Sequence, residues 1–369
     1  MKKLAIIGAS YLQLPLVRKA KEMGIETHCF AWEEDAICKT IADFFYPISI
    51  LDKESILEVC ERIDIDGIIS IASDAAVPTV SYVAEKMALI GNDFKDSIVT
   101  TDKFKMRKRF SEFSVASPKF CIAESEYSID DFRFPVIVKP TDRSGSRGVK
   151  KVENLGDVQV AVQRAKNESF AKKAIIEEYI SGSEVSVESV SWQGKHYILA
   201  ITDKVTTEEP YFVELEHHQP SLLSPEILIK IKDETQKALT ALNIKYGASH
   251  SEFKITTAGD VFAIEVGARM GGDFIGSHLV QLSTGYDFLK GVIDISLGHF
   301  EEPILTKKKS SGIYFLSQET EYLMPIIEQS DKYNEIVESE VTDEELHNIQ
   351  CSADRSGYFI YQAEKRFKI

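Results

Sequence analysis

The chain has 369 residues, 44% of them hydrophobic, and a formal net charge of −15. This length and composition predict a globular protein of two or three domains. Nucleic acids and anionic membranes attract clusters of Lys and Arg, and the sequence has no long basic run, so it argues against both partners and favours a small substrate. The sequence also has no apolar stretch long enough to span a membrane.

The cysteines are scattered along the chain. There are five, with no C-x-x-C pair: Cys29, Cys38, Cys60, Cys121 and Cys351. An odd number of dispersed thiols is typical of a reducing compartment, so we expect a cytoplasmic protein.

The first part of the chain alternates between apolar runs and amphipathic segments. Residues 4–8 (LAIIG) predict a buried strand, the segment up to Gly24 a helix, and IETHCFAW a second strand, which gives a βαβ unit. Further helix and strand patterns follow, and the basic segment 101–113 is helical. We therefore expect an α/β domain with an open sheet over residues 1–115.

The pattern changes after residue 115. From 116 to 190, short strands alternate with Gly-rich turns and one helix, which predicts a small α+β lid. From 191 to 369 we expect a third domain with more strands, a long helix at 224–243 and an acidic hairpin. Its last part, 301–369, has no recognisable motif, so we expect it to serve packing or dimerisation.

Lys139 ends the apolar strand PVIVKP and is followed directly by the loop TDRSGSRG. Gly145 and Gly148 allow the backbone to approach an anion, so the loop can direct N–H groups at phosphates while Lys139 adds charge from the strand beneath. A Gly/Ser-rich turn after a strand is more often only a turn, so both interpretations stay open. The residue order of a Walker motif is absent.

The strand EVSVESV has a polar face. Its period-two alternation places Glu184, Ser186 and Glu188 on one side. Such a face is also expected on any half-exposed strand. The apolar run before it, IIEEYI, can line an adenine pocket while its backbone reads the edge of the base.

The segment SHSEFKITTAGDVFAIEVGARMGGD predicts a hairpin with an acid on each strand. If the turn centres on Ala258 and Gly259, Glu252 and Glu265 stand directly opposite each other. At about 4 Å and an effective dielectric near 20, their repulsion is on the order of 4 kcal/mol. A divalent cation would reverse the sign, and Mg²⁺ suits two carboxylates whose shell is completed by water and nucleotide phosphates. A longer turn would instead leave two exposed glutamates in another register.

Two further polar features flank this hairpin in the sequence. Arg269 continues from the face of Glu265 into a glycine-rich loop, where a guanidinium can clamp a phosphoryl group or a carboxylate. His217 and His218 are adjacent on a strand and point to opposite faces, which argues against a shared metal. For His217 a single polar contact with ATP is the better interpretation.

In order and spacing, these segments resemble the ATP-grasp superfamily, in the branch that contains the carbamoyl-phosphate synthase large chain, biotin carboxylase and the amino-acid ligases. The resemblance covers roughly residues 1–300. It implies an ATP-grasp fold that mixes α/β and α+β parts: an N-terminal Rossmann-like domain, a small lid and a C-terminal mixed-sheet domain. It also implies ATP and Mg²⁺, with Mn²⁺ as a substitute.

A member of this superfamily binds the nucleotide with two lysines, a flexible glycine-rich loop, the backbone of a hinge, a ribose-binding acid and one further polar contact. The residues that match are Lys103, Lys139, Ser144, Gly145, Ser146, Gly148, Glu178, Ile180, Glu184 and His217. Glu252 and Glu265 match the two magnesium-binding glutamates. Arg269, together with Lys139, is expected at the transferred phosphoryl group.

One position departs from the superfamily pattern. Many relatives carry Asn two residues after the second glutamate, where this chain has Gly267, so the number of metal ions stays open. The run EVGARMGGD resembles a variant among amino-acid ligase-like members, and so does STGYD at 283–287.

The resemblance implies a carboxylate–amine ligase. Such an enzyme transfers a phosphoryl group from ATP to a small carboxylate, and an amine then attacks the acyl phosphate. Two alternatives remain: carboxylation or carbamoylation through carboxyphosphate, and a nucleotide-binding module without catalysis. Asp74, Lys204 and Asp273 are weaker candidates for substrate contacts.

Overall fold

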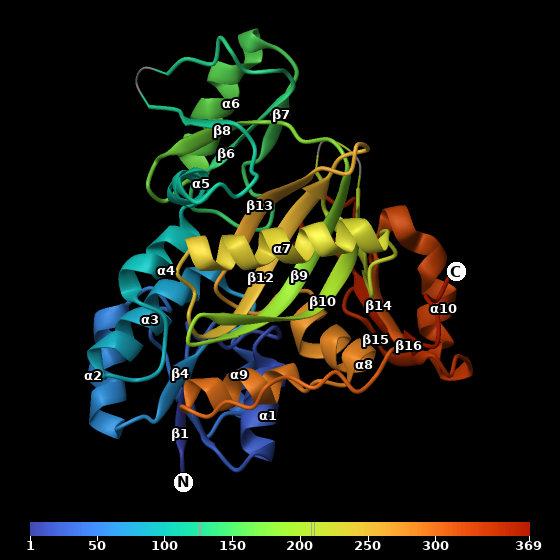
Figure 1. Ribbon diagram of the computed structural model, residues 1–369. Coiled ribbons are helices and arrows are strands. Elements are labelled where there is room, and N and C mark those ends of the chain that lie inside the picture. The colour runs from blue at the N-terminus through green and yellow to red at the C-terminus, as the bar shows by residue number, and fades with distance from the viewer. Residues whose placement is uncertain (125–126, 208, 210) are drawn as a thin grey trace.

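The computed structural model describes residues 1–124, 127–207, 209 and 211–369. Within these residues the strands form three sheets (Figure 1). A parallel sheet holds the N-terminal part of the chain, a small antiparallel sheet lies at the opposite end of the molecule, and a large antiparallel sheet lies between them.

The N-terminal sheet is parallel, with strand order β3-β2-β1-β4. Its strands and the helices of this part of the chain are β1 (Lys3–Ile7), α1 (Leu14–Glu22), β2 (Glu26–Phe30), β3 (Phe44–Tyr46), α2 (Lys53–Ile63), β4 (Gly67–Ile69), α3 (Val77–Lys86), α4 (Phe94–Thr101) and α5 (Lys103–Glu112). Residues 4–7 of β1 form a continuous apolar run and are all buried, as expected for a parallel strand that is covered on both faces. α2 begins after Asp52, whose side chain accepts a hydrogen bond from the Ser55 N–H.

The small antiparallel sheet has the order β5-β8-β6-β7. Its elements are β5 (Phe120–Ile122), β6 (Val136–Pro140), β7 (Lys150–Val152), α6 (Leu155–Glu168) and β8 (Ala174–Glu178). Val136 and Val138 of β6 pack against Val158 and Val162 of α6. This sheet therefore has a hydrophobic core of its own.

The large sheet has eight strands in the described residues, in the order β13-β12-β9-β10-β11-β14-β16-β15. Its strands and the helices of this part are β9 (Ser183–Trp192), β10 (Lys195–Thr206), β11 (Glu214–Gln219), α7 (Pro225–Ala241), β12 (Gly247–Ile255), β13 (Val261–Gly267), α8 (Val280–Thr284), α9 (Phe288–Ser296), β14 (Ser310–Leu316), α10 (Met324–Glu328), β15 (Ile336–Val341) and β16 (Gly357–Ala363). The segment without a sequence motif thus supplies three strands of this sheet.

Two helices join the large sheet to the rest of the molecule. Val292 of α9 belongs to a core that also contains Leu4 of β1 and Ala248 of β12. Met106 and Phe110 of α5 pack into the core beneath α7. The start of α5 is therefore held beside the large sheet. In the described part of the chain, every helix is too short or too polar to cross a membrane.

Candidate active site

A cavity opens where the small sheet, the large sheet and the start of α5 meet. Eleven of the thirteen residues expected to bind nucleotide or metal line it: Lys103, Lys139, Ser144, Gly145, Ser146, Glu178, Ile180, Glu184, Glu252, Glu265 and Arg269. Gly148 and His217 are not among its lining residues. The resemblance therefore selected residues that the fold brings together from positions more than 160 residues apart.

The glycine-rich loop follows β6 and covers one side of the cavity. Gly145 and Gly148 both have positive φ, 64° and 72°, which glycine adopts without strain. Gly145 lies at the cavity with open space around it. At Gly148 a Cβ would lie 3.1 Å from the Glu168 side chain. Gly148 therefore packs the base of the loop against α6 instead of facing the cavity.

Lys103 connects this loop to the metal-binding candidates. Its Nζ donates to the Arg143 carbonyl and to Glu265 Oε1, both at 2.8 Å, and its backbone N–H donates to the Thr141 carbonyl, also at 2.8 Å. Burial alone would lower the pKa of the Lys103 ammonium, but Glu265, Asp74 and Glu177 together outweigh it and raise the pKa. The ammonium therefore stays charged at the mouth of the loop.

Glu177 is a buried acid that the sequence analysis did not select. Its carboxylate lies 2.8 Å from Lys139 Nζ and 2.9 Å from Arg107 Nε. Burial raises the pKa of Glu177, but Arg107 and Lys139 outweigh this effect and lower it. For Lys139, burial and the neighbouring Arg107 lower the pKa despite the attraction of Glu177. The only sequence signal was an acid inside the apolar run IIEEYI.

The hinge after β8 is bound to its neighbours through its first amides. The N–H of Glu178 donates to the Lys119 carbonyl at 2.9 Å, and that of Tyr179 to the Pro135 carbonyl at 3.1 Å. Within the described residues, the N–H of Ile180 has no backbone acceptor. Because Ile180 also lines the cavity, its N–H can donate to a bound base.

The two hairpin acids stand opposite each other, as the sequence predicts, but a register shift and not the turn alone aligns them. Glu252 of β12 pairs with Glu265 of β13, and a register shift follows directly after Glu252. Their repulsion is offset by ammonium groups from outside the hairpin. Lys204 Nζ lies 2.7 Å from Glu252, and Lys103 Nζ lies 2.8 Å from Glu265.

Lys204 is buried among three acids. Besides Glu252, its Nζ contacts Glu184 at 2.9 Å and Glu214 at 3.2 Å. Burial lowers its pKa, but the three carboxylates outweigh this and raise the pKa well above the usual value. The chain thus supplies a fixed positive charge among the acids of the cavity.

His250 lies behind Glu252 on the same strand. Its Nδ1 contacts the buried Glu188 and its Nε2 lies 3.3 Å from Glu252 Oε1. Glu188 also accepts a hydrogen bond from the Gly271 N–H at 3.0 Å. Burial lowers the pKa of His250, but Glu188 and Glu252 together outweigh it and raise the pKa to about 9. Glu252 is therefore held in place from two sides, by Lys204 and by His250.

The acid pair fits a hard divalent cation in part. Both carboxylates are about one quarter exposed and line the cavity. In the described chain, no group of three or more His, Cys, Asp or Glu is placed to hold a metal. Two carboxylates without a full protein cage suit Mg²⁺, which keeps waters and takes phosphate oxygens as further ligands.

Arg269 points toward the N-terminal part of the chain. Its Nε and Nη2 donate to the two carboxylate oxygens of Asp74 at 2.9 and 2.8 Å. A Cβ on Gly267 would lie 2.6 Å from Asp74 Oδ1 and 3.2 Å from Arg269 Nε. Glycine at 267 therefore makes room for this ion pair, and an asparagine there would displace it.

His217 is fully buried and contacts Asp273, with Nε2 3.5 Å from Oδ2. Asp273 also receives Arg355 Nη1 at 2.9 Å, and the Arg355 guanidinium lies over the Phe315 ring. Burial lowers the pKa of His217 and outweighs the attraction of Asp273. β14 and β16 extend the sheet beyond β11, and His217 is buried where β11 pairs with β10 and β14, directly across from Lys204.

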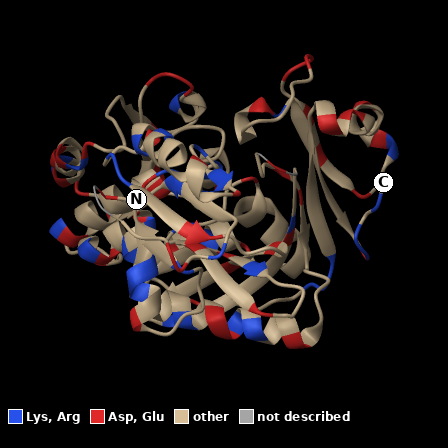
Figure 2. Ribbon diagram, turned by 90° about the horizontal axis from the view of Figure 1, so that it is seen from above, with Lys and Arg blue, Asp and Glu red and all other residues tan. Residues whose placement is uncertain are grey.

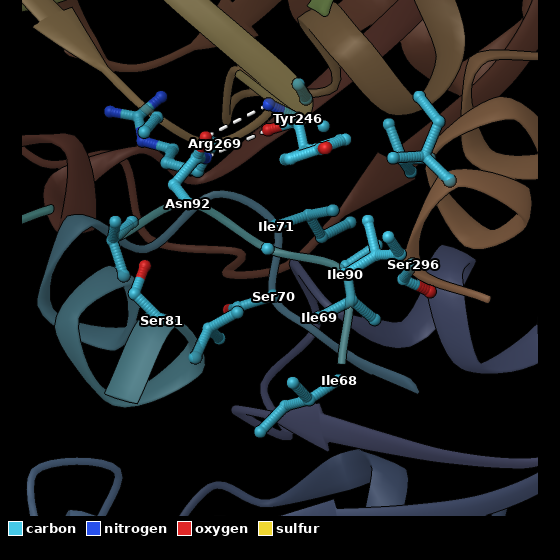
Figure 3. Close-up of a pocket in the computed structure, with 18 residues that line it drawn as sticks. Ile68, Ile69, Ser70, Ile71, Ser81, Ile90, Asn92, Tyr246, Arg269 and Ser296 are labelled. Carbon is cyan, nitrogen blue, oxygen red and sulfur yellow. Dashed lines mark hydrogen bonds between the residues drawn. The ribbon is translucent and has the colours of Figure 1, made fainter. Parts of the chain in front are cut away.

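Arg269 also borders a second, smaller cavity of about 70 Å³ (Figure 3). Figure 3 shows Ile68, Ile69 and Ile71 around it. The polar Asn92 at its edge is already paired: its Nδ2 donates to the Tyr246 carbonyl at 2.9 Å and its Oδ1 accepts from the Tyr246 N–H at 3.0 Å. The cavity is therefore a mainly apolar space behind the arginine.

Residues 132–277 match a family model described as an ATP-grasp domain. Alanine–anticapsin ligase of Bacillus subtilis is 26% identical over 272 residues, which cover 63% of this chain and 57% of that protein. The carbamoyl phosphate synthase large chain of Caldanaerobacter subterraneus is 25% identical over 262 residues, 69% of this chain and 24% of that protein. This chain thus spans just over half the length of the ligase and about a quarter of the synthase.

Solved structures share the fold over almost the whole chain. The L-amino acid ligase from Bacillus licheniformis superposes with a TM-score of 0.82 at 21% identity, covering 99% of this chain and 94% of that one. The ADP complex of the N5-carboxyaminoimidazole ribonucleotide synthetase purK gives a TM-score of 0.80 at 16% identity, with coverage of 99% and 93%. The chain therefore has the ATP-grasp fold and carries an ATP-grasp domain at residues 132–277.

Proposed function

We propose that this chain is an ATP-dependent, ADP-forming ligase that joins a small carboxylate to an amine through an acyl phosphate. The observation that carries the proposal is the facing pair Glu252 and Glu265 in one cavity with Lys139 and the glycine-rich loop. The similarity to alanine–anticapsin ligase and to an L-amino acid ligase supports amino acids as the substrate class.

The same cavity supports a binding mode for ATP. We infer that the Ile180 N–H and the Glu178 carbonyl read the adenine and that Glu184 binds the ribose. Lys103, Lys139 and the amides of 144–146 then surround the phosphates. Gly148 holds the base of the loop, and His217 lies directly across from Lys204, which lines the cavity.

The metal in this proposal is Mg²⁺, with Mn²⁺ as a substitute, held by Glu252 and Glu265 together with nucleotide oxygens. When bound, it would neutralise charge on the phosphates during transfer. Lys204 and Lys103, which neutralise these acids in the present structure, lie within reach of the same phosphates.

The chain's own residues then carry two steps. A carboxylate oxygen of the first substrate attacks the γ-phosphorus and ADP leaves, while Arg269 and Lys139 stabilise the charge on the transferred group. The amine nitrogen of the second substrate next attacks the acyl carbon, inorganic phosphate leaves and the nitrogen loses a proton. The glycine-rich loop excludes water so that the acyl phosphate reaches the amine.

The three sheets support a division of the chain into three domains. We propose domains at residues 1–115, 116–190 and 191–369, with β9 contributing to the large sheet from Ser183 onward.

The five cysteines are unpaired in the described structure, which supports a reducing compartment, and we propose the cytoplasm. A biotin carboxylase domain with this fold crystallised as a dimer, so a homodimer is a further proposal.

A screen of amino-acid pairs tests the function. We expect phosphate release that needs MgATP and both substrates, and a product whose mass equals the two substrates less one water. Bicarbonate with ammonia serves as a separate arm. Phosphate release only in that arm would favour carboxyphosphate chemistry, and tight MgATP binding without turnover in any arm would favour a binding module.

A further inference from the structure

A separate groove of about 890 Å³ lies between α7, α8 and β10, and it shares no lining residue with the nucleotide cavity. Figure 1 shows β10 between these two helices. Leu199, Ala200 and Ile201 of β10 form its floor, and Leu228 of α7 lies on one wall. The volume is in the range of small-molecule pockets, about 300–1,000 Å³.

Apolar side chains also lie at the mouth of this groove, where they are open to solvent. Leu222, which follows β11, is 68% exposed, and Leu305 on the opposite coil is 46% exposed. Large apolar side chains that line one concave surface and remain accessible are typical of binding sites. The apolar surface thus continues from the floor to the rim.

The rim carries a strong positive charge in a chain whose net charge is −15. The cationic residues are Lys232, Lys307, Lys308, Lys309, Lys365, Arg366 and Lys368, against the single acid Glu364. Figure 2 shows basic residues on the coil that leads to the C-terminus. This concentration of charge attracts an anion.

Most of these cations have no acidic partner. Arg366 contacts Asp203, and Lys309 Nζ lies 3.2 Å from Glu364. The other five rim lysines form no ion pair with any residue that the structure describes. Their charge is therefore available to a ligand.

We propose that this groove binds a small amphiphile, a linear apolar chain that ends in an acidic head group. The alkyl chain of the ligand lies on Leu199 and Ile201, and its acidic head group contacts Lys307 and Lys308 at the rim. A concave groove of about 890 Å³ with a floor on a sheet strand suits a single alkyl chain better than the flat surface of a second protein. Carboxylate and phosphate heads share this chemistry.

Calorimetry on the full chain tests the proposal with probes kept below their micelle concentrations. The probes are dodecanoate, dodecyl phosphate, dodecanol, dodecyltrimethylammonium and butanoate. We expect one saturable site for the two acidic probes, with affinities at least about tenfold higher than those of the neutral and cationic probes. Comparing dodecanoate with dodecyl phosphate shows which acidic head group is preferred. Butanoate, which has the carboxylate but only a short alkyl chain, should bind far more weakly.

Two variants locate the site. The double variant Lys307→Glu and Lys308→Glu reverses two exposed charges without touching the core, and we expect it to weaken dodecanoate binding about tenfold or more. Lys150→Glu, at the exposed first residue of β7 in the small sheet, is the control for charge reversal away from the groove and should leave binding unchanged. Ala200→Phe fills the floor and should also weaken binding, with its folding checked by circular dichroism.

Three results would overturn the proposal. The first is equal binding of acidic and cationic probes, or none. The second is dodecanoate affinity that the rim variant does not change. The third is a dimer of the wild-type chain that the rim variant converts to monomer, without dodecanoate binding. That result would make the groove an interface between copies. None of these results depends on ligase activity.

Discussion

Asp74 and Arg269 form a bidentate ion pair across 195 positions of sequence, with N–O distances of 2.9 and 2.8 Å. Asp74 follows β4 in the N-terminal sheet, and Arg269 follows β13 in the large sheet. The planar guanidinium is thus fixed in orientation by a residue from another part of the molecule. Asp74 is in this respect a positioning residue for the proposed phosphoryl-binding arginine.

Asp74→Asn should lower kcat for substrate-dependent ADP release by about 10- to 100-fold, because a misplaced Arg269 stabilises the transferred group less well. The KM for ATP should change little, since the adenine and ribose contacts lie elsewhere in the cavity. Asp294→Asn, which breaks a surface pair with Lys290, is the control. Unchanged kcat in Asp74→Asn would show that the pair does not position the arginine.

Glu265→Gln should reduce ATP turnover by at least about 100-fold while the fold remains intact. The amide keeps a hydrogen-bond acceptor for Lys103 but lacks the charge that a divalent cation requires. Steady-state ADP release over a range of Mg²⁺ concentrations measures the effect. Glu302→Gln, an exposed acid near Lys195, should behave as wild type. Normal turnover in Glu265→Gln would contradict the metal role.

Glu177→Gln should lower the free energy of unfolding by about 3–5 kcal/mol, because it leaves the buried Lys139 and Arg107 without their carboxylate. Urea unfolding measures this difference. Glu54→Gln, an exposed acid on α2, should leave the free energy of unfolding nearly unchanged. A loss below about 1 kcal/mol in Glu177→Gln would show that the two cations find other compensation.

Asp273 should make stability depend on acidic pH. Burial raises its pKa, but Arg355 and His217 outweigh burial and hold the pKa well below its usual range. In the unfolded chain the pKa of an aspartate is about 3.9. Because the pKa of Asp273 is lower in the folded state, its charged form stabilises the fold above about pH 3.9, and this stability is lost as the pH falls from that value toward the folded-state pKa. The stability difference between wild type and Asp273→Asn should therefore shrink below about pH 4. Asp260→Asn, an exposed loop variant, should show no such trend in urea unfolding.

Local pattern predicted the hairpin and its facing acids, but not the irregularity that aligns them. Glu252 does face Glu265, as a turn centred on Ala258 and Gly259 predicts. The pairs nearer the turn centre on Ala258 instead, and a register shift after Glu252 restores the facing pair. The same pattern could not reveal how the repulsion is offset. Lys204 comes from a strand 48 positions earlier and Lys103 from a helix 162 positions earlier, so only the packed fold shows these contacts.

Long-range packing also decided the place of His217. Alternation along β11 fixes which face His217 occupies, but it gives no information about what covers that face. The strands of 301–369, which carry no motif, pair beyond β11 and help enclose the histidine beside Asp273. Glu177 was missed for a related reason, because its partners Arg107 and Lys139 lie on other elements.

The strand order places β16 between β14 and β15, although β16 is synthesised after both. In the described structure, β15 pairs only with β16. During translation one edge of β14 is therefore unpaired until β16 has left the ribosome. For the same reason, β15 cannot join the sheet before β16 has emerged. An unpaired apolar edge invites pairing with other chains. The nascent protein should be more prone to aggregation in the interval between the emergence of β14 and that of β16.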